Sequence, residues 1–202
     1  MNADSVTSSG SGKSTVAAGS VIPARQLTAV SGEPVTIPDP GKFVHLQFAR
    51  FAGCPICNLH LRSFVRRSGE IASAGIREVV VFHSSDEQLR KYESDLPFTL
   101  IGDPGKRMYR QFGVESTLRS LISPRMWPLW PRFIWNDLRM ALGRQHIIAP
   151  VTPAGGLVGL PADFLIAPDG MVIAAKYGQY AYDQWSVDDL LACMPPTRQY
   201  GA

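Results

Sequence analysis

The chain has 202 residues, of which 45% are hydrophobic and 18% are charged, and its formal net charge is +3. This length suits one globular domain carrying a tail or an insertion. The sequence has no dense basic stripe like those of nucleic-acid-binding proteins, and no run of about eighteen apolar residues that could cross a bilayer. It therefore predicts no nucleic-acid partner and no integral membrane segment.

The N-terminal segment is rich in Ser, Gly and Thr and poor in large apolar residues. Such a segment cannot bury enough surface to offset the entropy lost on ordering, so residues 1–20 are predicted to be a disordered tail. It also has neither the basic start nor the apolar stretch of a secretory signal peptide. We therefore expect a cytoplasmic protein with one domain over residues 21–202.

Predicted strands and helices alternate along the first part of this domain. A nearly continuous apolar run at 76–82 is typical of a strand covered on both faces, and Pro55 can open a helix whose apolar residues recur at helical spacing. The predicted order is extended segments at 25–30 and 34–37, a buried strand at 42–49, a helix from Pro55 to about Gly75, a strand at 76–82, a helix at 85–94, a strand at 97–101 and a short helix ending at Phe112.

Residues 115–155 interrupt this alternation. Beyond them, segments 162–167 and 171–176 flank the turn sequence Pro168-Asp169-Gly170, which predicts a hairpin. Residues 186–189 can cap a last helix. The whole order predicts an α/β fold in which helices cover both faces of a central mixed sheet, with an insertion before the last hairpin.

The segment Cys54-Pro55-Ile56-Cys57 stands between the buried strand at 42–49 and the helix that follows it. The free N–H groups and partial positive charge of a helix N-terminus stabilise a thiolate, so the pKa of Cys54 is expected to be lower than the ordinary value of about 8.5. Cys57, one turn further on, can attack oxidised Cys54 and close a disulfide. The motif predicts thiol redox chemistry.

A zinc half-site and a pair of inert buried cysteines are the alternatives to redox chemistry. Zinc needs a second ligand pair, but Cys193 and the four histidines show no matching spacing. No metal and no cofactor are therefore expected, and Cys193 is interpreted as structural. His60, one turn beyond Cys57, is either a proton shuttle or a residue of the polar helix face.

The interrupting segment 115–155 holds three of the four tryptophans, Trp127, Trp130 and Trp135, among further apolar residues and several arginines. We expect it to form a helical insertion. It could cover the redox site, form the surface of a homodimer or bind a membrane surface.

Several short motifs, in this order, are similar to those of the AhpC/TSA branch of the thioredoxin superfamily. They are FARFAGCPICNLHLR at 48–62, PFTLIGDP at 97–104 and GLPADFLIAPDG at 159–170. The chain thus resembles a peroxiredoxin-like protein over residues 19–114 and 156–194. This resemblance implies a thioredoxin-like fold, with Cys54 as the peroxidatic, or N-terminal redox, cysteine. It also implies a cis-proline at Pro161 beside that cysteine, with an ordinary trans-proline that opens a strand as the alternative.

The sequence departs from the family's pattern at positions that matter for peroxide reduction. Phe51 stands where the family has a threonine whose hydroxyl holds the peroxide, and Gln47 stands where it has a proline. Pro161 occupies the position of an arginine. Arg50 or Arg62 could supply the positive charge instead, because a cation near a thiolate favours its ionisation, although both could be ordinary surface residues.

The leading hypothesis is a peroxiredoxin-like antioxidant enzyme. Cys54 would reduce a peroxide, Cys57 would close the disulfide, and a thioredoxin-type dithiol partner would reduce it. The second hypothesis is a thioredoxin-like protein disulfide reductase without peroxidase activity, and the third is a redox-gated partner-binding module. The predicted site residues are Arg50, Cys54, Cys57 and Pro161.

Overall fold

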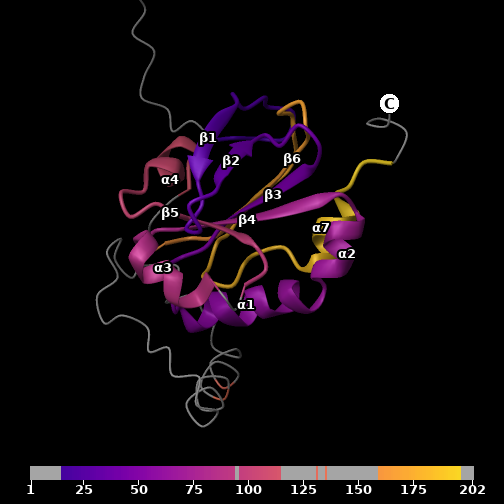
Figure 1. Ribbon diagram of the computed structural model, residues 1–202. Coiled ribbons are helices and arrows are strands. Elements are labelled where there is room, and N and C mark those ends of the chain that lie inside the picture. Colours follow the sequence, from indigo (N-terminus) through magenta and orange to yellow (C-terminus); the bar gives the residue numbers. More distant parts are fainter. Residues whose placement is uncertain (1–14, 94–95, 115–130, 132–134, 136–158, 197–202) are drawn as a thin grey trace, which may run out of the picture.

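The computed structural model describes residues 15–93, 96–114, 131, 135 and 159–196. The strands are β1 (Arg25–Thr28), β2 (Pro34–Ile37), β3 (Phe43–Phe48), β4 (Ile76–Phe82), β5 (Thr99–Gly102), β6 (Ala162–Ile166) and β7 (Val172–Tyr177). The helices are α1 (Pro55–Arg66), α2 (Ser68–Ser73), α3 (Asp86–Glu93), α4 (Arg107–Gln111) and α7 (Val187–Ala192). Their arrangement is shown in Figure 1.

The larger sheet has five strands in the order β5-β4-β3-β6-β7, and β1 pairs with β2 in a separate sheet. Strand β3 is parallel to β4 and antiparallel to β6. Helices α1, α2 and α3 lie on one side of the sheet, while the β1–β2 pair and α4 lie on the other (Figure 1). The predicted architecture, a mixed central sheet covered on both faces, is confirmed.

Alternate side chains of the central strands fill two separate cores. On one face, Val44, Leu46 and Phe48 pack with residues of β2 and α4. On the other face, Val80 and Phe82 contact residues of α1, and a neighbouring cluster joins α1, α2 and α7. Burial on both faces is the reason for the apolar run at 76–82.

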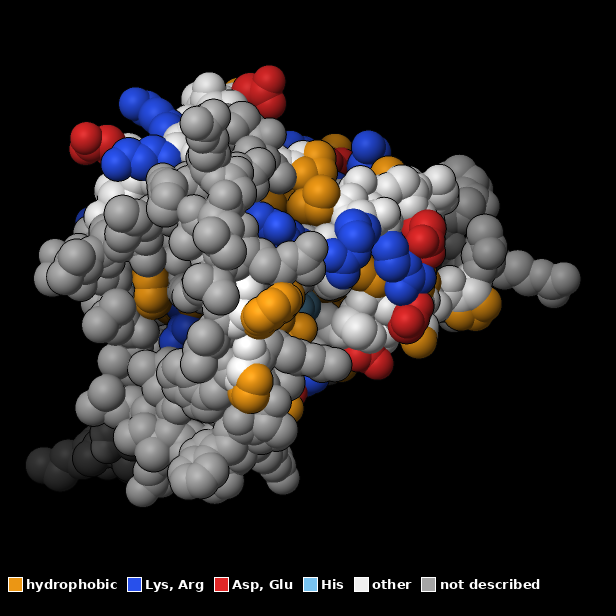
Figure 2. Space-filling view, turned by 90° about the horizontal axis from the view of Figure 1, so that it is seen from below, with side chains coloured by type: hydrophobic (Ala, Val, Ile, Leu, Met, Phe, Trp, Pro, Cys, Tyr) orange, Lys and Arg blue, Asp and Glu red, His pale blue; other side chains and the backbone are white. Residues whose placement is uncertain are grey.

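The helix predicted from Pro55 to Gly75 is two helices. Arg67, with φ −115° and ψ 18°, separates α1 from α2. Its guanidinium pairs with Glu70 and Asp188, each at 2.7 Å. Basic and acidic side chains also lie next to one another on the face seen in Figure 2. The apolar spacing continues through the break because Phe64 and Ile71 enter the same core.

Both segments predicted to flank or interrupt the domain lie largely outside the described residues. Of the predicted insertion at 115–155, only Pro131 and Trp135 are described, and both are helical. Of the predicted tail at 1–20, residues 15–20 are described, and they run beside β7, where the Gly19 N–H donates to the Val172 carbonyl at 2.8 Å. Within the described ranges, no helix has the length and apolar character needed to span a membrane.

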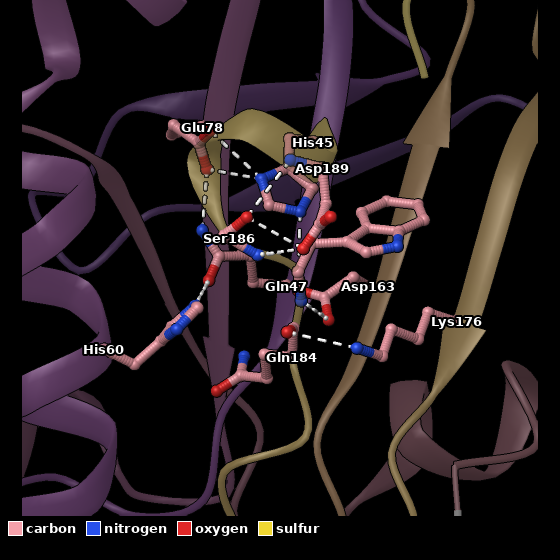
Figure 3. A network of polar contacts seen from close by, with 10 residues as sticks. His45, Gln47, His60, Glu78, Asp163, Lys176, Gln184, Ser186 and Asp189 are labelled. Carbon is pink, nitrogen blue, oxygen red and sulfur yellow. Dashed lines mark hydrogen bonds and ion pairs between the residues drawn. The ribbon is translucent and has the colours of Figure 1, made fainter. Parts of the chain in front are cut away.

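A network of buried polar side chains crosses the sheet beneath α1 (Figure 3). His45 of β3 lies between two carboxylates, with Nδ1 2.9 Å from Glu78 Oε2 and Nε2 3.4 Å from Asp163 Oδ1. Gln47 Nε2 donates to Glu78 Oε2 at 2.8 Å, and Gln47 Oε1 lies 3.3 Å from His60 Nε2. The network therefore connects β3, β4 and β6 to α1.

At neutral pH one imidazole of this network, that of His45, is a cation, and the other, that of His60, is neutral. Burial alone would lower the pKa of His45, but the charge of Glu78 and the contacts with Asp163 and Glu78 outweigh it and raise that pKa to about 9. Burial lowers the pKa of His60 to about 4. His60 is only 6% exposed, so it does not belong to a polar helix face.

Replacing His60 with Gln is expected to change the pH dependence of stability on the acid side. Because the folded-state pKa of about 4 lies below the ordinary 6.5, the wild type must lose stability as the pH falls from 6.5 towards 4. The maximum slope for one proton is about 1.4 kcal/mol per pH unit. In urea unfolding, the free energy of unfolding of His60→Gln should rise relative to that of the wild type as the pH falls through this range. Parallel curves of stability against pH for the two proteins would show that folding does not lower the pKa of His60.

Candidate active site

The Cys54–Cys57 segment begins where the chain turns from the carboxyl end of β3 into α1. Gly53 has a φ of 79°, a conformation that favours glycine, and the turn places Cys54 at the N-cap of α1. The Ala52 N–H donates to Ser84 Oγ at 2.9 Å, which fastens the turn to the segment after β4. Pro55 occupies the first helical turn, where its missing N–H is not needed.

The sulfur of Cys54 accepts hydrogen bonds from two donors. Arg50 Nη2 lies 2.9 Å from Cys54 Sγ, and the backbone nitrogen of Cys57 lies 3.4 Å from it. Cys54, Cys57 and Arg50 are 1%, 4% and 3% exposed. The structure thus brings these three residues together in a buried site, where a cation is held against sulfur with little water to screen it.

The two thiols titrate as one unit and share a single negative charge. Burial opposes ionisation of Cys57, but the hydrogen bond from Cys54 and the charge of Arg50 outweigh it and lower the pKa of Cys57 to about 6. Burial, with the hydrogen bond and charge of Cys57, raises the pKa of Cys54 well above its usual range. At neutral pH one thiolate therefore lies beside Arg50.

The prediction of a lowered pKa at Cys54 is therefore wrong for the reduced pair. The helix N-terminus does present an N–H to Cys54 Sγ, as expected. However, once the pair carries one negative charge, a second anion in the same buried site is opposed by repulsion and by the loss of hydration. The sequence pattern could not show this, because it depends on the position of Arg50 and the burial of both sulfurs.

A small apolar pocket of about 30 Å³ opens beside the two sulfurs. Its lining residues are Phe51, Ala52, Gly53, Cys54, Cys57, Asn58, Leu61, Phe82, Leu89, Leu96 and Leu100. Sequence reasoning missed this pocket because its walls come from α1, α3, β4, β5 and the loops that precede α1 and β5. It gives an apolar group a place next to the thiolate.

Pro161 lies immediately before β6, and the peptide bond that precedes it is trans. Among the residues described, the cis bond is Ile37–Pro38. The cis-proline expected at Pro161 is therefore wrong. The Pro161 carbonyl accepts the Gly178 N–H at 2.9 Å, so this residue already continues the ladder between β6 and β7, with the favoured trans isomer.

His83 is a residue of this site that sequence reasoning missed. It follows β4 directly, and its backbone N–H donates to the Arg50 carbonyl at 3.0 Å. The ring is fully buried, with its centroid 6.2 Å from that of Phe51 and 5.7 Å from that of Tyr109. Burial and the charges of Lys106 and Arg50 lower the pKa of His83 to about 4, so the ring is neutral at pH 7. The sequence signal that could have identified His83 is a polar residue directly after an apolar parallel strand.

Metal-binding geometry is not found in the part of the chain that the structure describes, since no group of three His, Cys, Asp or Glu side chains is placed to hold an ion.

Cys193 is a free, partly buried cysteine at the end of α7. It packs with the cluster around Trp185, whereas Cys54 and Cys57 belong to another cluster.

Comparisons with known proteins identify a matching sequence family and similar solved structures. A sequence profile of the AhpC/TSA family matches residues 18–175. The structure is similar to that of peroxidoxin BcpB from Mycobacterium tuberculosis, with a TM-score of 0.61, 16% identity and coverage of 88% of this chain and 95% of that one. No curated protein sequence matches the chain.

Two further solved structures resemble it. They are a thiol:disulfide interchange protein DsbE from Chlorobium tepidum (TM-score 0.54, 18% identity, 89% of this chain and 99% of that one) and a 2-Cys peroxiredoxin from Plasmodium vivax (TM-score 0.59, 15% identity, 87% and 79%). At these identities the likeness establishes the fold, which is thioredoxin-like as expected.

Replacing Arg50 with Met should raise the pKa at which the reduced pair loses its first proton. The charge of Arg50 lowers that pKa, which is about 6 in the wild type. Loss of a neighbouring cation shifts a pKa by about one to three units. A titration of thiolate ultraviolet absorbance measures the change. Arg62→Met is the matched control and should leave the titration unchanged. A shift in Arg62→Met with none in Arg50→Met would show that Arg62, and not Arg50, stabilises the thiolate.

Proposed function

The chain belongs to the AhpC/TSA family of thiol-dependent oxidoreductases, and on this premise we propose that it reduces peroxides through a dithiol–disulfide cycle. The observation that supports this proposal is the buried contact of 2.9 Å between Arg50 Nη2 and Cys54 Sγ. It keeps one thiolate charge in the Cys54–Cys57 pair at neutral pH. The thiolate is the form of cysteine that attacks peroxides.

Cys54 is the proposed nucleophile because both hydrogen-bond donors reach its sulfur. Its proton passes to Cys57 along the hydrogen bond between the two sulfurs as Cys54 reacts. The Cys54 sulfur then bonds to the terminal oxygen of a hydroperoxide while the O–O bond breaks, and the leaving oxygen takes up a proton. Cys54 becomes a sulfenic acid, and the peroxide is reduced to water or an alcohol.

Cys57 completes the cycle in this proposal. Its sulfur attacks the sulfur of the sulfenic acid, expels water and closes the disulfide. The Cys57 backbone nitrogen already lies 3.4 Å from Cys54 Sγ, so the bond requires only a local change in the first turn of α1. A thioredoxin-type dithiol then reduces the disulfide by exchange.

A second function, disulfide exchange on protein substrates, is supported by Phe51. This side chain lines the pocket at the sulfurs and has no hydroxyl to hold a peroxide. Disulfide exchange needs only the two cysteines, a stabilised thiolate and an approach to the sulfur. The apolar pocket beside Cys54 would then hold a side chain of the protein substrate.

Reduced protein mixed with one equivalent of hydrogen peroxide should lose its thiols about tenfold faster than free cysteine at pH 7. A thiol with a pKa near 6 is mostly ionised at that pH, whereas free cysteine is ionised to a few per cent, and the lower basicity of the sulfur offsets part of this gain. Stopped-flow measurement of thiol loss checks the rate.

The cysteine variants separate the two steps of the peroxidase cycle. Cys54→Ser should abolish the fast phase, and Cys57→Ser should stop at a sulfenic acid that a trapping reagent captures. A wild-type rate no faster than that of free cysteine would argue against peroxide reduction. Insulin disulfide reduction that is lost in Cys54→Ser would then support the exchange function.

A further inference from the structure

The hydrogen-bond ladder between the parallel strands β3 and β4 shifts by one residue just before the redox site. The Ala49 N–H donates to the Val81 carbonyl at 2.9 Å, and in a regular parallel ladder the His83 N–H would then donate to the Ala49 carbonyl. It donates instead to the carbonyl of Arg50, at 3.0 Å. The β3 side therefore holds one extra residue, as in a β-bulge, and such irregularities redirect the side chains beside them.

This shift accounts for the direction of the Arg50 side chain. Along β3, Phe48 faces the core that includes α4, while Ala49 belongs to the cluster that contains Cys54. Strict alternation would place Arg50 on the side of Phe48. Its guanidinium instead lies against Cys54, with Nη2 2.9 Å from Sγ. The contact that stabilises the thiolate thus requires the backbone to keep its irregular path at Ala49 and Arg50.

Tyr109 of α4 contacts the backbone at the shifted position. Its hydroxyl donates to the Ala49 carbonyl, which the shift has taken out of the ladder, and lies 2.9 Å from the Val81 carbonyl. The side chain is 1% exposed, and its ring packs edge-on against Phe48 with 4.9 Å between centroids. The Ala49 carbonyl and the Arg50 nitrogen belong to one planar peptide group, so a hydrogen bond that fixes the oxygen also fixes the backbone of Arg50. This contact comes from α4, on the face of the sheet away from α1 (Figure 1).

We propose that Tyr109 is a positioning residue whose hydroxyl maintains the register shift that aims Arg50 at the Cys54 sulfur. This inference rests on the proposed function for its effect on the reaction rate, whereas ionisation of the thiol pair tests it independently. A phenylalanine at position 109 keeps the ring contacts but leaves the Ala49 carbonyl without this donor. The peptide group can then relax towards the regular ladder, which moves the guanidinium away from the sulfur and weakens their attraction.

Tyr109→Phe tests this proposal through the pH dependence of the thiol pair. The pKa at which the reduced pair loses its first proton is about 6 in the wild type. It should rise by about 0.5–1 unit, less than the one to three units expected when a neighbouring cation is lost. Oxidation by hydrogen peroxide should therefore slow about two- to fivefold near pH 6, and match the wild type above about pH 8, where both pairs are ionised.

Tyr177→Phe is the matched control for the loss of a hydroxyl. The Tyr177 hydroxyl also donates to a backbone carbonyl, that of Phe112, at 2.6 Å. Its loss should leave the thiol titration and the pH profile of the peroxide reaction unchanged. A shift of the same size in Tyr177→Phe would show that general loosening of the fold, and not the contact at Ala49, changes the thiolate.

A double-mutant cycle shows whether Tyr109 acts through Arg50. In the Arg50→Met background, Tyr109→Phe should leave the thiol titration unchanged. An unchanged titration in Tyr109→Phe alone, or an equal shift with and without Arg50, would overturn the proposal. If the titration shifts as expected but the wild type reacts with peroxide no faster than free cysteine, the proposed function fails and the positioning role of Tyr109 is supported.

Discussion

The contact between the Arg50 guanidinium and the Cys54 sulfur is the constraint on which the site depends. A cation that is 3% exposed needs a counter-charge, because the loss of its hydration is otherwise uncompensated. The carboxylates of the buried network are held by His45 and Gln47, so the ionised thiol pair provides that charge. The buried position of the charged Arg50 therefore depends on ionisation of the cysteines, and their ionisation depends on Arg50.

Two polar systems lie on the α1 side of the sheet, at different points along the strands. Beneath α1, His45 is a cation between Glu78 and Asp163, and this arrangement ties the redox helix to three strands. At the carboxyl ends of β3 and β4, Arg50 faces sulfur instead. Since opposite charges are satisfied within each system, the helix can be held firmly without a carboxylate near the thiolate, which would raise the pKa of the pair.

Sequence patterns predicted what depends on local chemistry. The apolar run of β4, the proline that opens α1 and the position of the two cysteines all follow from neighbouring residues. The break at Arg67, the burial of His60 and His83, and the trans bond before Pro161 depend on contacts between distant segments. The single negative charge of the thiol pair is of this second kind, because it arises only when Arg50 and both sulfurs share a buried space.

The pairing of Arg50 with a thiolate has a consequence for redox poise. When the two cysteines form a disulfide, the site loses its negative charge, and the guanidinium loses its counter-charge. Arg50 therefore stabilises the reduced protein relative to the oxidised one, which moves the reduction potential of the couple in the oxidising direction. A couple poised in this way gives up its disulfide readily to a dithiol donor, so the same cation that prepares the sulfur for oxidation also favours its return to the reduced state.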